Sequence, residues 1–372
     1  MQENNQSVLI DASRLVIESM ARAGVDAFIG YPITPANLLY LYGSQRMPMM
    51  LPAPDEITTL QWMTGLAATG KLTVTATSFP GYALMVESIN MAFMMELPMV
   101  IILVQRLGPA TGTATCGAQG DLLGLHGTLS GGHSLPVLAT SDFNDCWTLA
   151  ADAVDMAVTL RSPVILLTSK EEVMTSKRFD LSLLNTIEPV QRPEYSGPAP
   201  YKPYLADTNH VPPFLPVTNT THQVRLNAST HDTNGILQHS SEEALNNTVR
   251  LERKITDCPD CFIHFDYDKP SGADTLVVSY GITAAAARNA VLELNRQGIG
   301  TSLLVVKTLL PVPGVYADII AQYKTVIIAE ENINHQLVRL LYGTRMPDNI
   351  RTVGAIGKMI TPEAIIREGA RQ

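Results

Sequence analysis

Two uninterrupted apolar runs, 99–105 and 163–168, constrain the fold of this chain more than any other feature of its sequence. Each is far shorter than the roughly 20 residues that cross a membrane, and neither alternates as a strand with one face in water would. Runs of this kind are typical of parallel strands that helices cover on both faces. The sequence therefore predicts an α/β protein built on a parallel sheet.

The rest of the first half alternates between helical and strand patterns. Apolar residues at helical spacing predict helices over 8–23, 56–69, 82–96 and 144–160, and short apolar runs predict further buried strands at 27–30 and 73–77. Because such an alternation produces a sheet with helices on both faces, we predict a doubly wound first domain over residues 1–190.

The stretch 191–268 has a different composition. Seven prolines fall between Pro193 and Pro216, and only 242–255 has the pattern of a helix. Since the stretch is too long for a simple connection, we expect an irregular segment that wraps another domain or a partner.

The alternation resumes in the last hundred residues. Strand patterns occur at 275–279, 301–306, 325–329 and 350–353, with helices at 283–296, after Pro313, at 333–342, and from Thr361-Pro362-Glu363. A second, smaller doubly wound domain is predicted over 269–372.

Charge and targeting signals exclude some classes of function. The net charge is −9 and the chain has no basic run, which argues against nucleic-acid binding. No signal peptide or membrane span is evident, so we expect a cytoplasmic protein. Cys258 and Cys261 form a lone C-x-x-C pair, which is too few ligands for zinc or an iron–sulfur cluster. We expect two free thiols in a loop and no metal site.

The first candidate site residues lie in the loop Gly30-Tyr-Pro-Ile-Thr-Pro35, where a strand gives way to a helix. Ligands of open α/β sheets bind at this edge. Two prolines fix the loop, so Thr34 is held with little freedom. The alternative is a rigid turn in which Thr34 is only the helix N-cap.

Three further segments follow strands or open helices. Glu56 begins an apolar helix, where it could face a ligand or only favour the helix N-terminus. The loop 77–81 has small, rigid residues that let a flat ligand approach. Arg106 follows a buried strand and could pair with a ligand carboxylate or with a structural acid. The conjunction of these loops is stronger evidence for a site than any one of them.

A set of motifs spread over nearly the whole chain resembles the α subunits of the 2-oxoacid:ferredoxin oxidoreductases. The motifs are Tyr31-Pro-Ile-Thr-Pro35, the Glu56 helix, Thr77-Ser78-x-Pro80-Gly81, Glu96-Leu97-Pro98, Gln105-Arg106-x-Gly108-Pro109-x-Thr111-Gly112, Asp121-Leu122-Leu123, Gly131-Gly132-His133, His231-Asp232-x-x-Gly235, and Glu330-Glu331-Asn332 with Gln336-Leu337. The resemblance implies a pyrimidine-binding thiamine-fold domain followed by a transketolase C-terminal-like domain.

The same resemblance implies the chemistry. Thiamine diphosphate would be shared with a β subunit, which holds the diphosphate and Mg²⁺ through a Gly-Asp-Gly…Asn motif that this chain lacks. The reaction would convert a 2-oxoacid of the pyruvate or 2-oxoglutarate class to acyl-CoA and CO₂. Gamma- or delta-type subunits with [4Fe-4S] clusters would pass electrons to ferredoxin, and coenzyme A would take the acyl group.

Site roles are also implied by the resemblance. Glu56 would hydrogen-bond the pyrimidine ring nitrogen, Thr34 would bind the substrate's oxo or carboxylate oxygen, and Arg106 would pair with a substrate carboxylate. The cofactor would lie against Tyr31, Pro32, Ile33, Ser78, Phe79, Pro80 and Gly81.

Phe79 departs from the family pattern, which has glycine there, so we expect a reshaped turn or a ring in the substrate pocket. The alternatives are another thiamine diphosphate enzyme, either a non-oxidative decarboxylase or a transferase, and a non-catalytic scaffold.

Overall fold

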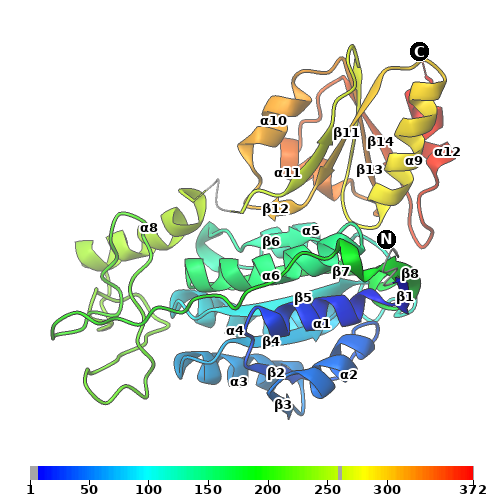
Figure 1. The fold of residues 1–372 in the computed structure, drawn as a ribbon. Helices are drawn as coiled ribbons and strands as arrows, with labels where there is room; N and C mark the ends of the chain where they lie inside the picture. The colour runs from blue at the N-terminus through cyan, green and yellow to red at the C-terminus, as the bar shows by residue number, and fades with distance from the viewer. Residues whose placement is uncertain (1–6, 259–261, 372) are drawn as a thin grey trace, which may run out of the picture.

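A seven-stranded sheet forms the core of the first part of the chain (Figure 1). The computed structural model describes residues 7–258 and 262–371. The sheet has the order β12-β6-β7-β5-β4-β2-β3, and all its neighbours are parallel except β12 and β6. Its strands are β2 (Ala27–Gly30), β3 (Met49–Pro52), β4 (Thr73–Thr77), β5 (Met99–Gln105), β6 (Val137–Ala139), β7 (Pro163–Ser169) and β12 (Thr308–Leu310).

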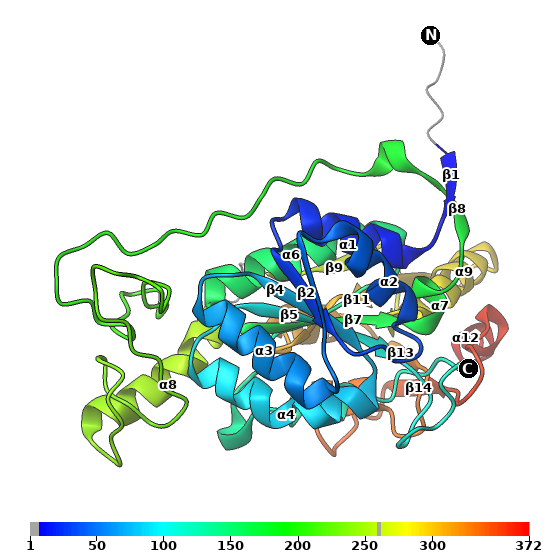
Figure 2. The same cartoon turned by 90° about the horizontal axis from the view of Figure 1, so that it is seen from below.

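Helices cover both faces of this sheet, as the continuous apolar strands predict. Figure 2 shows α1 and α6 on one side, and α3 and α4 on the other. The helices of this part are α1 (Ala12–Arg22), α2 (Asn37–Arg46), α3 (Glu56–Ala68), α4 (Phe79–Met94), α5 (Leu122–His126), α6 (Phe143–Leu160) and α7 (Lys170–Val173), with short 3-10 turns η1 (Ser130–Gly132) and η2 (Leu181–Leu183). Every residue of β5 and β7 is buried, which confirms the central strands of the prediction.

A five-stranded sheet of order β14-β13-β10-β11-β9 forms the second core. It is parallel except for the edge strand β9, which pairs antiparallel with β11. Its elements are β9 (Phe265–Asp268), β10 (Thr275–Ser279), α9 (Thr283–Arg296), β11 (Thr301–Val306), α10 (Gly314–Ile320), β13 (Thr325–Glu330), α11 (Gln336–Tyr342), β14 (Ile350–Gly354) and α12 (Pro362–Gly369). The division into 1–190, 191–268 and 269–372 stays a prediction, since β12 from the last of these ranges completes the first sheet.

The connection between the two cores is irregular, as its prolines predict. Residues 184–241, all of which the structure describes, contain no helix or sheet strand. The segment leads into α8 (Glu242–Thr256), which lies beside the first sheet's helices at one end of the molecule (Figures 1 and 2).

Several sequence-based expectations are corrected. Residues 8–10 belong to a strand, β1 (Ser7–Ile10), which pairs antiparallel with β8 (Lys177–Asp180), and not to a helix. The helix begins only after Asp11, whose side chain accepts a hydrogen bond from the Arg14 amide and so caps it. Helix α4 begins at Phe79, three residues earlier than expected.

The cysteine expectation is also partly wrong. Cys116 and Cys146 are free, but Cys258 is disulfide-bonded, so it is not the free thiol that we expected. Cys261 lies outside the described residues. Among the helices of the described ranges, none is both long and apolar enough to cross a membrane.

Candidate active site

The strand order brings the predicted site loops to one edge of the first sheet. Strands β2, β4 and β5 are neighbours and run parallel, so their carboxyl ends meet at the same edge. The loops that follow them are 31–36, the start of α4, and the loop after Gln105. Helix α3 opens at the same edge, after β3.

Thr34 and Arg106 are in direct contact across this edge. The Nη1 of Arg106 donates a hydrogen bond of 2.6 Å to the backbone carbonyl of Thr34. The N-cap of α2 is Ala36, and its side chain makes no capping bond, so the alternative of Thr34 as a mere cap is wrong. The Thr34 hydroxyl accepts a hydrogen bond of 3.1 Å from the side-chain amide of Asn37. It can still donate its own proton to a ligand.

Arg106 is buried, and its electrostatic neighbour is an acid. Its Nε has no hydrogen-bond partner within the described residues. Burial lowers the pKa of Arg106 below its usual value, and the charge of Asp121 acts in the opposite direction. The guanidinium therefore has unused donors in a desolvated place, which suits it to bind a carboxylate.

Glu56 and Gly81 form a second pair at the same edge. Asp55 caps α3 by accepting a hydrogen bond from the Thr58 amide, so the cap role belongs to Asp55 and leaves the Glu56 carboxylate uncommitted. Glu56 is only 7% exposed. A Cβ on Gly81 would lie 2.6 Å from Glu56 Oε1 and 2.3 Å from Thr77 Oγ1. Glycine at 81 thus makes the room that the carboxylate occupies.

Ser78 and Phe79 open α4 in different ways. The Ser78 side chain is fully buried, makes no capping bond, and its Oγ has no partner among the described residues. Phe79 is the first helical residue and does not have a positive φ, so its backbone is not strained, and the reshaping of the turn stays a prediction. Its ring packs against Tyr82, with centroids 6.1 Å apart, and fills the space where Gly124 lacks a side chain.

Asp121 is a candidate site residue that sequence reasoning did not assign a role. It is 6% exposed, and its Oδ2 has no hydrogen-bond partner in the described parts of the chain. Burial raises its pKa from 3.8 to about 7, although Arg106 acts to lower it. The sequence contained one signal: an acid in an apolar context, in the motif Asp121-Leu122-Leu123, with no basic residue near it in the chain.

Gln119 joins this loop to the second sheet. Its side chain donates to the Tyr280 carbonyl at 2.8 Å, and its Oε1 accepts from the Thr283 hydroxyl and the Glu331 amide, both at 2.8 Å. The backbone carbonyl of Gln119 accepts hydrogen bonds from the Tyr280 hydroxyl and from the side-chain amide of Asn332, both at 3.1 Å. The Glu330-Glu331-Asn332 motif of the sequence is therefore an interdomain contact.

Glu96, from the Glu96-Leu97-Pro98 motif, holds α8 against the first domain. It is completely buried and pairs with Arg250 and with Lys254, whose Nζ lies 2.8 Å from its Oε2. Burial alone would raise the pKa of Glu96, but the charges of Lys254 and Arg250 outweigh burial and lower it to about 2. This cluster is structural and lies apart from the predicted site residues.

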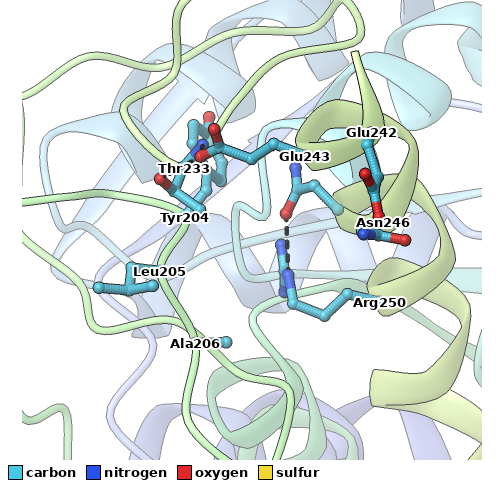
Figure 3. Close-up of a pocket in the computed structure, with 9 residues that line it drawn as sticks. Tyr204, Leu205, Ala206, Thr233, Glu242, Glu243, Asn246 and Arg250 are labelled. Atoms are coloured by element: carbon cyan, nitrogen blue, oxygen red, sulfur yellow. Dashed lines mark hydrogen bonds between the residues drawn. The ribbon is translucent and has the colours of Figure 1, made fainter. Parts of the chain in front are cut away.

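A cavity of about 490 Å³ lies beside α8, between it, Thr233 and the 204–206 segment (Figure 3). None of the predicted site residues lines it. Arg250 points into this region (Figure 3), but it donates to Asn247 at 2.9 Å and pairs with Glu96. Since its charged group is already satisfied, the cavity adds nothing to the candidate active site.

The fold defines an α/β protein with two doubly wound cores, and the candidate site lies at the carboxyl edge of the first. A family model described as pyruvate flavodoxin/ferredoxin oxidoreductase, thiamine diphosphate-binding, matches residues 18–250, and the chain belongs to this family. The sequence-based identification of the family and of the fold class is thereby confirmed.

Named relatives agree with this assignment. The chain is 27% identical to the 2-oxoglutarate synthase subunit KorA of Methanocaldococcus jannaschii, over 93% of this chain and 94% of that protein. It is 30% identical to the 2-oxoglutarate oxidoreductase subunit KorA of Mycobacterium tuberculosis, over 88% of this chain and 50% of that protein.

A solved structure is also similar. It is a 2-oxoglutarate:ferredoxin oxidoreductase from Magnetococcus marinus with 2-oxoglutarate, coenzyme A and succinyl-CoA bound. The match has a TM-score of 0.90 and 25% identity, and covers 99% of this chain and 65% of that chain. A split gene transketolase, at a TM-score of 0.55 and 12% identity, shares the fold alone.

Proposed function

We propose that this chain is the pyrimidine-side subunit of a 2-oxoacid:ferredoxin oxidoreductase that converts a 2-oxoacid to acyl-CoA and CO₂. One observation carries the proposal: a chain of this family brings Thr34, Arg106, Glu56 and Gly81 to one strand edge. The curated names of its relatives favour 2-oxoglutarate as the substrate.

The residues at this edge fit half of a thiamine diphosphate site. The uncommitted Glu56 carboxylate and the Ser78 hydroxyl, which has no partner among the described residues, are polar groups available to a flat ring, and the missing Cβ of Gly81 leaves the room in which the Glu56 carboxylate lies. Thiamine diphosphate, when bound, supplies the carbanion chemistry of decarboxylation. The ring would also lie against Tyr31, Pro32 and Ile33, with Phe79 and Pro80 at the start of α4.

Three side chains of this chain have roles in the proposal. Glu56 shares a proton with the pyrimidine ring nitrogen from its buried position. Thr34 donates its hydroxyl hydrogen to the substrate's oxo or carboxylate oxygen. Arg106 uses its free donors to bind a substrate carboxylate, and its bond to the Thr34 carbonyl keeps the two groups in a fixed relation.

The surface beside Glu56 supports a partner subunit. Helices α3 and α4 pack on each other and carry one charged residue each, Glu56 and Glu87. Ile57, Trp62 and Leu84 are each more than 40% exposed on this face. An exposed apolar face of this kind is typical of an interface. We infer that a β subunit with the Gly-Asp-Gly…Asn motif covers it and holds the diphosphate and Mg²⁺.

The electron path is part of the same proposal. Within the described residues, no group of three or more His, Cys, Asp or Glu side chains could hold a metal ion. In the proposal, the [4Fe-4S] clusters are on gamma- or delta-type subunits, which pass electrons to ferredoxin. Coenzyme A would accept the acyl group, as the bound molecules of the similar solved structure suggest.

The proposal is tested on the complex purified through a tag on this chain. Viologen reduction is measured with a panel of 2-oxoacids, with and without coenzyme A. We expect reduction with one oxoacid, and a decrease of about 10²–10⁴-fold in Glu56→Gln, because a positioned acid–base group contributes about this much.

Glu293→Gln is the control, since Glu293 lies on α9, where it pairs with the exposed Arg296 and accepts an exposed hydrogen bond from Gln297. Dye reduction that survives in Glu56→Gln would overturn the role of Glu56. Product without dye reduction would indicate a non-oxidative thiamine enzyme, and no turnover with bound cofactor would favour the scaffold alternative.

A further inference from the structure

Arg106 and Asp121 are oppositely charged, buried and incompletely bonded. Arg106 is 6% exposed and its Nε has no partner within the described residues, and Asp121 is 6% exposed and its Oδ2 has none there either. Each influences the pKa of the other, so their charges interact. Among the described residues, Arg106 donates a side-chain hydrogen bond to the Thr34 carbonyl and none to Asp121.

Within the described residues, Arg106 is the cation whose charge acts on the pKa of Asp121. The groups that face it are Arg106 and Gln105 from the end of β5, the phenol of Tyr82 on α4, and the phenol of Tyr280 from the second domain. Burial is the main cause that raises the pKa of both phenols, and the charge of Asp121 adds to it, so both phenols stay neutral and do not compete for the guanidinium. Gly120 beside it is exposed, which gives protons from solvent a short path.

We propose that Asp121 is a positioning residue that takes up a proton from solvent when an anionic 2-oxoacid binds Arg106. The substrate carboxylate then replaces the Asp121 carboxylate as the negative partner of the guanidinium. This inference rests on the proposed function, in which Arg106 binds substrate.

The reason is electrostatic. Two carboxylates that share one buried guanidinium repel each other, so binding of the second favours protonation of the first. Burial already brings the pKa of Asp121 to about 7, which puts its proton within reach near neutral pH. Proton binding and substrate binding are then linked, and each promotes the other.

The linkage has a definite size. Below pH 7 Asp121 is mostly neutral, so Arg106 is available to bind the substrate carboxylate. Above pH 7 Asp121 is mostly charged and occupies Arg106 as its negative partner. With a midpoint of about 7, the neutral fraction falls about tenfold between pH 6 and pH 8, and the apparent affinity for substrate falls with it. Binding at pH 8 should take up about 0.9 proton per site.

The test is calorimetry on the purified complex with N-oxalylglycine. In this analogue of 2-oxoglutarate an amide replaces the reactive ketone, so binding is measured without turnover. Titrations at pH 8 in buffers of different ionisation enthalpy give the number of protons taken up. We expect close to one proton for the wild type and close to none for Asp121→Asn, which keeps the shape but cannot ionise.

Two further variants make the result unambiguous. Glu172 is a matched control: it is buried, its pKa is also raised to about 7 by burial, and it bonds to Thr140, Thr168 and Ser169 instead of an arginine. Glu172→Gln should take up protons as the wild type does. Arg106→Gln should lose most of its affinity for the analogue.

The outcomes separate the two proposals. If Arg106→Gln binds the analogue as tightly as the wild type, the role of Arg106 in the proposed function is wrong. If Arg106→Gln binds weakly while Asp121→Asn takes up protons like the wild type and keeps the tenfold pH dependence, the proposed function stands and the inference about Asp121 is overturned.

Discussion

Gly81 is the single residue at which the candidate site tolerates least change. Its missing side chain is the space next to the Glu56 carboxylate and the Thr77 hydroxyl. Both neighbours are buried, and Glu56 is held at the first turn of α3, so neither can move aside freely.

We predict that Gly81→Ala displaces Glu56. The overpacking should cost about 1–3 kcal/mol of folding free energy. A displacement of about 1 Å at a catalytic group can cost about 10²-fold in rate, and we expect a loss of this order. Thermal unfolding, thiamine diphosphate content and viologen reduction of the complex measure these effects.

Gly314→Ala is the matched control, because nothing lies within 4 Å of a Cβ there and its φ is not positive. Activity equal to the wild type in Gly81→Ala would show that Glu56 is not confined by this contact.

The sequence alone predicted some of the candidate site residues, and it did not predict the contacts between distant parts of the chain. Thr34, Glu56 and Arg106 were predictable because each lies beside a strand end or a helix start, which local patterns mark. The hydrogen bond from Arg106 to Thr34 spans 72 residues, and those between Gln119 and the second domain span more than 160. Because such contacts depend on the packing of distant elements, local patterns gave no sign of the role of Gln119 and left Asp121 as a motif without a partner.

Helix α8 shows how one buried ion cluster fixes an element. Its inner face brings Arg250 and Lys254 to Glu96, which sits just after α4. The Glu96 backbone also accepts a bond of 3.2 Å from Arg161, whose guanidinium donates to the carbonyls of Pro212 and Pro213. The helix and the irregular segment before it are thus tied to the same point.

We predict that Glu96→Gln loosens α8. Removing one partner of a buried ion pair costs about 3–5 kcal/mol, since the cations remain buried. Glu18→Gln is the control, because its pairs with Arg22 and Arg46 are largely exposed and should be worth less than about 1 kcal/mol. Hydrogen exchange within α8 and thermal unfolding measure the difference; equal effects in the two variants would contradict it.

The pH dependence of this cluster has a definite sign. The pKa of Glu96 is lowered from 4.5 to about 2, so its charge stabilises the fold fully above about pH 4.5. That stabilisation is lost as the pH falls from 4.5 toward 2. Glu96→Gln should therefore show a weaker loss of stability over this range than the wild type.

At the scale of the elements, buried strands were predicted from the sequence more accurately than exposed strands. The fully buried β5 and β7 were predicted to within a residue, but β1 was taken for helix because its residues are half exposed and extend the helical spacing of α1. β6 and β12, of three residues each, were missed because they are short and because they pair with each other across about 170 residues of chain.

In the whole molecule, Gln119 is the polar centre of the contact between the two cores. Its hydrogen bonds to Tyr280, Thr283 and Glu331 are buried, and so are the groups that they satisfy. Buried polar groups left without partners cost about 1–3 kcal/mol each.

We predict that Gln119→Ala weakens the docking of the second domain by several kcal/mol in total. Calorimetry should then resolve two unfolding transitions where the wild type shows one, and the affinity for N-oxalylglycine should fall because Asp121 is two residues away. Gln322→Ala is the control, since Gln322 follows α10 and makes exposed hydrogen bonds with Lys269 and with the Asp318 carbonyl. A single unshifted transition in Gln119→Ala would contradict this role.

The position of β12 has a consequence for synthesis on the ribosome. The first sheet ends in β6 until β12 pairs with it, and β12 leaves the ribosome more than 160 residues after β6. During that interval the apolar strand β6 has an edge with unpaired backbone N–H and C=O groups. An unpaired edge of this kind can form hydrogen bonds with a strand of another chain. A nascent chain stopped before Thr308 would be a substrate for chaperones, and only synthesis of the second domain closes the edge of the first.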